Sequence, residues 1–372
     1  MDSTKLKQLL DCGQSYWLDN LTRDMIENGE LKKRVEDEGL RGITSNPKTF
    51  GDSIRESDRY DADIKRLAGE GEDVETVYEA LMVEDIQNAC DILRPVYDES
   101  DGRDGFVSLE VDPRLARHTE ATIEAARRLF QSVDRPNCMI KIPGTEEGLA
   151  AIETALFEGI NVNITLLFSQ GRYKQVVAAH QRALDRRRQA GKPVESVASV
   201  ASFFLSRIDV LVDELIGHRH TKAAPNDLLA GRRGQLAIAL ARIVYREFEK
   251  DYKDSSAWQG LAADGAQPQR PLWASTGTKN PDDKPTKYID PLIAPQTVST
   301  MPEKTIEAFA ESGTVAENAI SESDTPSAQV IEDFAGGGID LEYVSQRLED
   351  EGIQKFIDPY EEAVESIREQ IG

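Results

Sequence analysis

Cys138-Met139-Ile140-Lys141-Ile142-Pro143-Gly144 is the stretch of this 372-residue chain that most clearly predicts its fold. The apolar run indicates a buried strand, and Pro143 with Gly144 ends it. Lys141 lies in the middle of this strand, where burial would remove the hydration of its ammonium group. We interpret Lys141 as a residue placed for chemistry. The alternative is a lysine at a strand edge whose side chain extends to water.

Seven further short apolar segments resemble this strand, and helical patterns separate most of them. The eight predicted strands are residues 16–18, 42–44, 106–111, 138–142, 162–168, about 197–204, 271–274 and about 288–294. Apolar residues at every third or fourth position predict helices at 114–130, 173–184 and 236–248. Asp112 and Pro113 supply an N-cap and a first-turn proline for the first of these helices.

Strands that alternate with helices predict a parallel sheet, because each parallel crossover needs a covering segment. Eight repeats indicate an α/β fold closed as a single (β/α)8 TIM barrel, although five or six would fit an open sheet equally well. Two stretches go beyond the strand-and-helix units of a minimal barrel. They are an acidic, mostly helical connection at 51–103 and a C-terminal helical extension from about residue 301. With no fixed repeat or low-complexity linker in the sequence, one domain over residues 1–372 is expected.

The charge balance restricts the partners of the chain. Lysine and arginine number 44 against 67 acidic residues, a formal net charge of −23. Such a surface repels nucleic acid and anionic membranes, whereas a small anionic substrate needs only a locally basic pocket. The sequence has no apolar run of the ~20 residues that span a bilayer and no signal-peptide pattern at its start. We therefore expect a cytoplasmic protein, with monomer and homodimer both open.

Nothing in the sequence predicts a metal ion or a cofactor. Cys12, Cys90 and Cys138 lack metal-type or redox-type spacing. The histidines lie in or at the end of predicted helices rather than in a converging cluster with carboxylates; they are His118, His180, His218 and His220. The glycines at 336–338 do not follow a strand with phosphate-loop or dinucleotide spacing, so they predict a turn.

Polar residues recur at one level of the predicted barrel, within strands or at their C-terminal ends. They are Asp19, Asn46, Glu110, Lys141, Asn163, Thr165 and Ser202. In a parallel barrel these strand ends form one rim, which is where such barrels carry their active sites. Lys48, just beyond this level, is interpreted as a solvated loop residue.

Lys141 with two carboxylates suggests Schiff-base chemistry. A desolvated amine is favoured in its neutral, nucleophilic form, and Asp19 and Glu110 could then act as general acid and base. Glu110 alternates with apolar neighbours, which places it on the opposite face from them and plausibly inside the barrel. For Asp19 the alternative is that it caps the following helix.

Five segments in order resemble signatures of the transaldolase family, over roughly residues 11–296. They are GITSNP at 42–47, VSLEV at 107–111, IKIPGT at 140–145, NVNITLLFS at 161–169 and SVASFFLSRID at 199–209. The resemblance implies an enzyme that moves a dihydroxyacetone unit from a ketose phosphate (sedoheptulose 7-phosphate or fructose 6-phosphate) to an aldose phosphate. It also implies a place in the non-oxidative pentose phosphate pathway, sugar phosphates as ligands, and no cofactor.

Carried over residue by residue, the resemblance also implies catalytic roles. Lys141 would form the Schiff base, and Asp19 would take the C4 hydroxyl proton as the C3–C4 bond breaks. Glu110 and Thr165 would hold the water that moves protons during imine formation.

The same resemblance implies a set of substrate-binding residues. Asn46 and Asn163 would hydrogen-bond the carbon skeleton, and Phe204 would line the cavity. Ser202 and Arg207 would bind the phosphate, for which a guanidinium group is well shaped. Lys279 is a further phosphate candidate, in a loop that differs from that of shorter family members.

Two positions separate close relatives within the resemblance. Fructose-6-phosphate aldolases carry glutamine and tyrosine where this chain has Glu110 and Phe204, so transfer is favoured over simple cleavage. The helical tail and the long connection at 207–270 resemble the longer bacterial type of transaldolase. An aldolase, or a barrel that binds sugar phosphates without turnover, remains the alternative.

Overall fold

Eight parallel strands close into a barrel in chain order, as the sequence predicts. The computed structural model describes residues 4–219, 229, 231–321 and 326–371. The strands are β1 (Gln14–Leu18), β2 (Gly42–Ile43), β3 (Phe106–Glu110), β4 (Cys138–Pro143), β5 (Val162–Leu167), β6 (Ser199–Phe204), β7 (Arg270–Ala274) and β8 (Thr297–Met301). Almost every residue of these strands is buried, because helices cover the barrel from outside.

The predicted eighth strand at 288–294 is wrong. That segment contains a short 3-10 helix, Asp290–Leu292, and the closing strand is Thr297–Met301. Its apolar residues are buried, which explains the misassignment, but Pro291 has no N–H to give to a strand ladder. The carbonyl of Leu292 instead accepts hydrogen bonds from Gln14 and Trp273.

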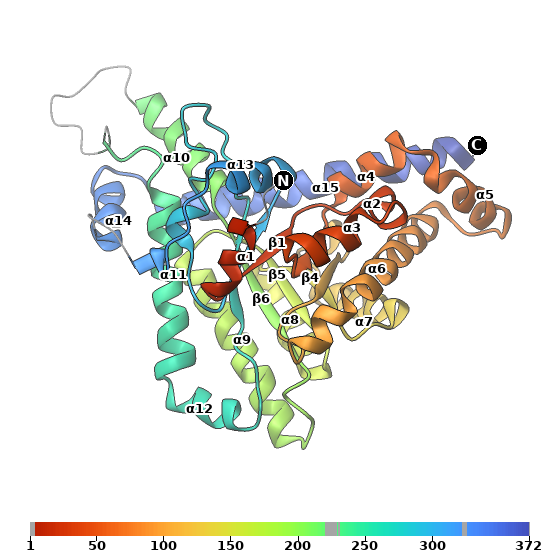
Figure 1. Ribbon diagram of the computed structural model, residues 1–372, viewed down its shortest axis with the longest axis horizontal. Coiled ribbons are helices and arrows are strands. Elements are labelled where there is room, and N and C mark those ends of the chain that lie inside the picture. The colour runs from red at the N-terminus through yellow and green to blue at the C-terminus, as the bar shows by residue number, and fades with distance from the viewer. Residues whose placement is uncertain (1–3, 220–228, 230, 322–325, 372) are drawn as a thin grey trace.

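Helices surround the barrel and extend beyond it (Figure 1). Those before the fourth strand are α1 (Thr4–Asp11), α2 (Arg23–Glu27), α3 (Glu30–Lys33), α4 (Pro47–Glu56), α5 (Asp61–Gly69), α6 (Val74–Glu99) and α7 (Thr119–Val133). Those after it are α8 (Glu146–Glu158), α9 (Gln170–Gln189), α10 (Ser206–Arg219), α11 (Leu236–Glu249), α12 (Ser256–Ala263), α13 (Glu303–Ser312), α14 (Ser327–Gly336) and α15 (Leu341–Ile371).

One predicted helix boundary differs from the observed one. The helix predicted from residue 114 begins at Thr119, because Asp112 and Pro113 start a separate 3-10 turn, Pro113–Leu115. The helical extension predicted from about residue 301 begins at Glu303 with α13, directly after Met301 ends β8.

The last helix, α15, joins the barrel to the long connection between β2 and β3. It packs beside α4 and α5 along the upper edge of the molecule in Figure 1. A second apolar cluster forms there, in which Phe50, Ile54 and Tyr78 meet Tyr360 and Ile367 of α15. The three helices of the connection, α4, α5 and α6, therefore bury apolar side chains in a cluster shared with the C-terminal helix.

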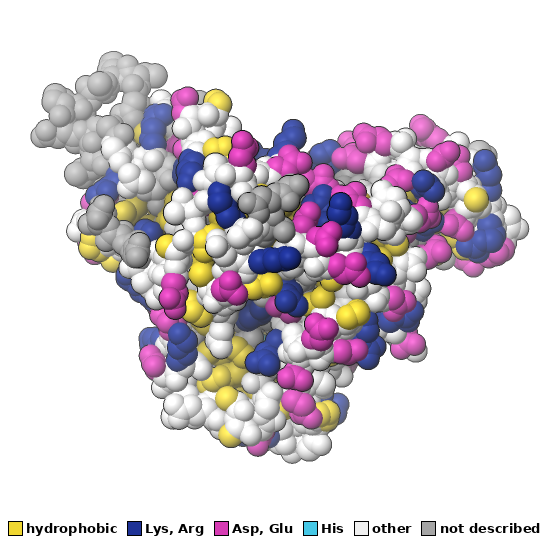
Figure 2. Space-filling view, viewed as in Figure 1, with side chains coloured by type: hydrophobic (Ala, Val, Ile, Leu, Met, Phe, Trp, Pro, Cys, Tyr) yellow, Lys and Arg dark blue, Asp and Glu magenta, His cyan; other side chains and the backbone are white. Residues whose placement is uncertain are grey.

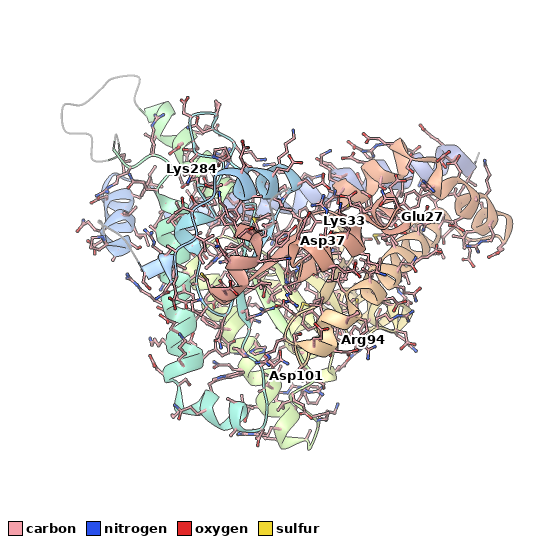
Figure 3. The ribbon with its side chains drawn as sticks, in the orientation of Figure 1. Glu27, Lys33, Asp37, Arg94, Asp101 and Lys284 are labelled. Atoms are coloured by element: carbon pink, nitrogen blue, oxygen red, sulfur yellow. The ribbon has the colours of Figure 1, made fainter. Side chains whose placement is uncertain are left out.

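The outer surface carries the excess of acidic side chains. Figure 2 shows acidic and basic side chains interspersed over one face, with many acidic ones on the arm of α4, α5 and α15. Exposed charged residues labelled in Figure 3, such as Glu27, Lys33 and Arg94, lie on the outer helices around the barrel. Within the described part of the chain, no helix is both long and apolar enough to cross a membrane.

Candidate active site

Lys141 points into the mouth of the barrel from β4. Its side chain is only 5% exposed. The Nζ atom lies 2.7 Å from Glu110 Oε1 and 2.8 Å from the carbonyl oxygen of Ser45. The interpretation of Lys141 as a strand-edge residue reaching for water is therefore wrong.

Glu110 stands beside Lys141 because the two residues are in register on neighbouring strands. Its predicted inward orientation is confirmed by the bond to Lys141. Burial raises the pKa of Glu110 to about 7, with the positive charge of Lys141 opposing that rise and Asp19 adding to it. A carboxylate with such a pKa can accept a proton from the neighbouring ammonium and leave a neutral amine. Glu110 is therefore a titratable carboxyl group in direct contact with Lys141 Nζ.

Asp19 lies at the same level, just past the end of β1. Its Oδ1 accepts a hydrogen bond of 2.8 Å from Thr44 Oγ1, and that hydroxyl lies 2.7 Å from Thr300 Oγ1. The N-cap of α2 is Thr22, so the alternative role of Asp19 as a helix cap is wrong. Thr44 and Thr300, which the sequence analysis did not single out, hold this carboxylate in place.

A buried polar network lies next to Lys141 inside the barrel. Asn163, in register with Lys141, donates from Nδ2 to Ser108 Oγ at 2.9 Å. Its Oδ1 accepts from Ser202 Oγ at 2.7 Å. Asn163 and Ser202 are therefore hydrogen-bonded to each other, and the Ser202 hydroxyl has to be redirected before it donates to an anionic ligand.

Thr165 has a buried hydroxyl that is available to a ligand or a water molecule. It is 1% exposed, and no described residue is hydrogen-bonded to its Oγ1. The next residue, Leu166, has a φ of 62°, and the pairing of β5 with β6 shifts register there. This irregularity ends the regular strand at the level of the site.

Arg207, in the first turn of α10, forms no ion pair with any residue that the structure describes. Its Nη1 is buried and has no hydrogen-bond partner among the described residues. The guanidinium carbon lies 5.1 Å from the ring centre of Phe204 and 5.9 Å from that of Phe356. Burial lowers the pKa of Arg207, although Asp19 and Glu351 oppose this effect. An unpaired, partly buried guanidinium is costly, so the position favours an anion.

These residues surround a cavity of about 840 Å3 at the C-terminal mouth of the barrel. Seven of the ten predicted site residues line it: Asp19, Asn46, Lys141, Ser202, Phe204, Arg207 and Lys279. Glu110, Asn163 and Thr165 are not among its lining residues; the first two adjoin Lys141 on the strands beside it.

Three of the lining residues do not simply point into the cavity. Asn46 caps α4 by accepting from the backbone N–H of Thr49 at 3.0 Å. Lys279 is exposed on the rim. Lys48 is exposed as predicted, but it lies in the first turn of α4 rather than in a loop, paired with Asp52 at 2.8 Å.

Helix α15 contributes to this cavity, which the sequence did not predict. Six residues of that helix line it: Leu348, Glu351, Lys355, Phe356, Asp358 and Pro359. The ring centre of Phe356 lies 5.6 Å from Lys141 Nζ. A glycine at position 352, in the middle of a helix, was the available signal that α15 approaches another part of the molecule closely.

No histidine or cysteine in the part of the chain that the structure describes lines the cavity. Among the described residues, no group of three or more His, Cys, Asp or Glu side chains is arranged to hold a metal ion. His180 is buried in the core, 3.0 Å from the Tyr252 hydroxyl, and burial lowers its pKa to about 3. His220, one of the four histidines considered, lies outside the described residues.

Comparison with known proteins agrees with this geometry. A family model described as Transaldolase/Fructose-6-phosphate aldolase matches residues 16–367. "Transaldolase 2" of Nostoc sp. is 45% identical over 372 residues, covering 98% of this chain and 97% of the relative. A transaldolase of Thermobifida fusca is 43% identical over 366 residues, covering 98% of each chain. A transaldolase of Mycobacterium tuberculosis is 42% identical over 363 residues, covering 98% of this chain and 96% of the relative.

Proposed function

The chain belongs to the transaldolase/fructose-6-phosphate aldolase family and has transaldolase function, and we propose that Lys141 carries this activity as a Schiff base at the barrel mouth. The substrates are sugar phosphates. A dihydroxyacetone unit passes from a ketose phosphate to an aldose phosphate. The single observation that supports this assignment most strongly is the buried Lys141–Glu110 pair, with Asp19 lining the same cavity.

Imine formation begins with the proton on Lys141. Glu110 takes it across the 2.7 Å contact, and the neutral amine attacks the C2 carbonyl of the ketose. The resulting carbinolamine has to lose a hydroxyl as water, which requires a proton donor. Glu110, now protonated, supplies that proton through a water molecule held with the Thr165 hydroxyl, whose hydrogen-bonding capacity is unused.

Carbon–carbon cleavage then needs a base at the other side of the imine. Asp19 removes the proton of the C4 hydroxyl, the C3–C4 bond breaks, and its electrons move into the imine to form an enamine. The bond from Thr44 orients this carboxylate. The aldose phosphate leaves, and a second aldose phosphate accepts the three-carbon unit by the reverse sequence.

Substrate binding is assigned to the remaining predicted residues. Arg207 binds the phosphate with its unpartnered Nη1, and Lys279 adds positive charge at the rim. Ser202 lines the same cavity, and its hydroxyl donates to the phosphate once it turns from Asn163. Asn46 and Asn163 hydrogen-bond the carbon skeleton, and Phe204 forms an apolar wall beside it.

We also propose that residues 1–372 form one domain. Beyond β8, α15 supplies part of the cavity lining and of the second apolar cluster, and α13 and α14 add Ile306, Phe309, Val330 and Phe334 to the main core.

Borohydride trapping tests the assignment of Lys141. Reduction in the presence of fructose 6-phosphate is expected to add a dihydroxyacetone-derived mass to the peptide that contains Lys141. Lys141→Ala and Lys141→Arg should lose both this adduct and turnover. Lys48→Ala, which removes the exposed lysine at the same mouth, should keep the adduct. An adduct that persists in Lys141→Ala would remove Lys141 from the mechanism.

A further inference from the structure

Helix α15 is fixed against the rim of the barrel by close backbone approaches. A Cβ added at Gly352 would lie 2.9 Å from Leu166 Cδ2 and 3.5 Å from Arg207 Nη1. Further along α15, a Cβ added to Gly51 of α4 would lie 3.0 Å from Ala363 Cβ and 3.4 Å from the carbonyl oxygen of Pro359. Glycine within a helix destabilises it by ~1 kcal/mol relative to alanine. At position 352 the glycine has a structural reason, because a Cβ there would require the Leu166 side chain to shift.

One turn beyond Gly352, the helix places Phe356 in the cavity, close to both Lys141 and Arg207. The ring is 8% exposed. Its centre is 5.6 Å from Lys141 Nζ and 5.9 Å from the Arg207 guanidinium carbon. A substrate held by an imine at Lys141 and by its phosphate at Arg207 would therefore lie along the face or edge of this ring.

The enamine left on Lys141 after cleavage has two chemical fates. It can attack the aldehyde carbon of an acceptor, which is transfer. It can instead take a proton on carbon to return to an imine, to which water adds; expulsion of the lysine amine then releases dihydroxyacetone. The second route consumes one water molecule and needs no other reactant, so its rate depends on how freely water reaches the enamine.

We propose that Phe356 is a specificity-determining residue that favours transfer by excluding water from the Lys141 adduct. The inference rests on the proposed function, and it assigns a reaction-directing role to a residue of the C-terminal helix. The ring centre lies 5.6 Å from Lys141 Nζ, whose hydrogen bonds go to Glu110 and to the carbonyl oxygen of Ser45. An apolar side chain there blocks solvent without supplying a proton donor.

The test compares two rates on the same enzyme preparation. With fructose 6-phosphate and erythrose 4-phosphate, transfer is measured as sedoheptulose 7-phosphate formed. With fructose 6-phosphate alone, release is measured as free dihydroxyacetone. Phe356→Ala and Phe356→Val should raise the ratio of release to transfer at least tenfold, whereas Phe356→Leu, which keeps most of the bulk, should change it less than threefold. Tyr343→Ala is the matched control, since this α15 side chain is 53% exposed and does not line the cavity.

The ratio does not depend on how much of a variant is folded, because inactive protein contributes to neither rate. A ratio within twofold of the wild type in both Phe356→Ala and Phe356→Val would overturn the inference. A wild-type enzyme that gives no borohydride adduct at Lys141 would instead overturn the proposed function. The two failures are therefore distinguishable.

Discussion

At the scale of single residues, the site depends on a lysine and a glutamate that share one buried position. Breaking such a pair by removing one partner usually costs about 3–5 kcal/mol, because the remaining charge is left uncompensated. Glu110 avoids part of this cost, since burial already raises its pKa to about 7 and it can become neutral. The same property makes it suitable as the proton acceptor of Lys141.

Glu110 should therefore control the pH dependence of the enzyme. Its pKa is raised from an unfolded value of about 4.3 to about 7 in the fold. Below that pH it holds its own proton and cannot take the one from Lys141, so kcat/KM should fall as pH decreases through about 7. Glu110→Gln should lower kcat by about 10²-fold or more and abolish this acidic limb.

A pH profile that keeps the same acidic limb in Glu110→Gln would show that another group causes the loss of activity at low pH.

The same pKa shift of Glu110 has a consequence for stability. Because the protonated form is favoured in the fold, the contribution of Glu110 to stability is full below about pH 4 and is lost as pH rises through about 7.

Arg207 should affect the phosphate end of the substrate alone. Losing a charge-assisted bond between guanidinium and phosphate corresponds to about 1.5–3 kcal/mol, or roughly 10- to 100-fold in kcat/KM. Arg207→Ala should show this loss, mainly through KM, with fructose 6-phosphate but not with unphosphorylated fructose. Equal losses with the two sugars would contradict the phosphate assignment. Arg207→Lys keeps the charge, so its kcat/KM with fructose 6-phosphate should lie between those of Arg207→Ala and the wild type.

At the scale of elements, α15 links three parts of the molecule that are far apart in sequence. One face packs on α4 and α5, another lies near β5 and α10, and the side chains between them line the cavity. Its position is set by backbone contacts at Gly352 and Gly51 rather than by side-chain pairs alone. Small displacements of this helix should therefore affect stability and catalysis together.

Gly352→Val tests that coupling. The new side chain would collide with Leu166 and adjoin Arg207, and overpacking of this kind costs about 1–3 kcal/mol. Tm should fall by several degrees, and transfer should slow because Phe356 and Arg207 are displaced. Gly336→Val is the control, because this glycine of α14 is exposed and a Cβ there meets nothing within 4 Å. Equal Tm values for Gly352→Val and the wild type would show that α15 adapts without strain.

At the scale of the whole molecule, the net charge of −23 opposes compactness. Exposed ion pairs cover the surface, but each contributes little, with typical values of about 0–1 kcal/mol. Long-range repulsion among the excess carboxylates acts on the folded state as a whole and is screened by salt. When salt is added, the relief of this repulsion should therefore stabilise the fold more than the weakening of individual surface ion pairs destabilises it.

Raising NaCl from low concentration to 0.5 M should thus increase Tm, by at least about 2 °C. Measuring the same series with KCl separates screening from an effect specific to sodium. A Tm that falls with salt would mean that the surface ion pairs dominate over the net charge.

The sequence by itself determined the class of the fold and most of the residues that line the candidate site. Seven strands and the rim-level polar residues followed from local pattern, because a buried parallel strand leaves an apolar run in which Lys141 and Glu110 stand out. The eighth strand did not follow, since Thr297–Met301 is less apolar than the buried segment just before it.

Only the tertiary structure decided which groups meet. The pairing of Glu110 with Lys141 depends on the register between β3 and β4. The position of Asp19 depends on the hydrogen bond from Thr44, whose hydroxyl is bonded in turn to Thr300 of β8. The position of Phe356 depends on how α15 packs, more than 200 residues along the chain from Lys141. Local sequence fixes the conformation of an element through its periodicity and caps. Contacts between distant elements depend instead on the shapes of both surfaces, which no single segment of the sequence contains.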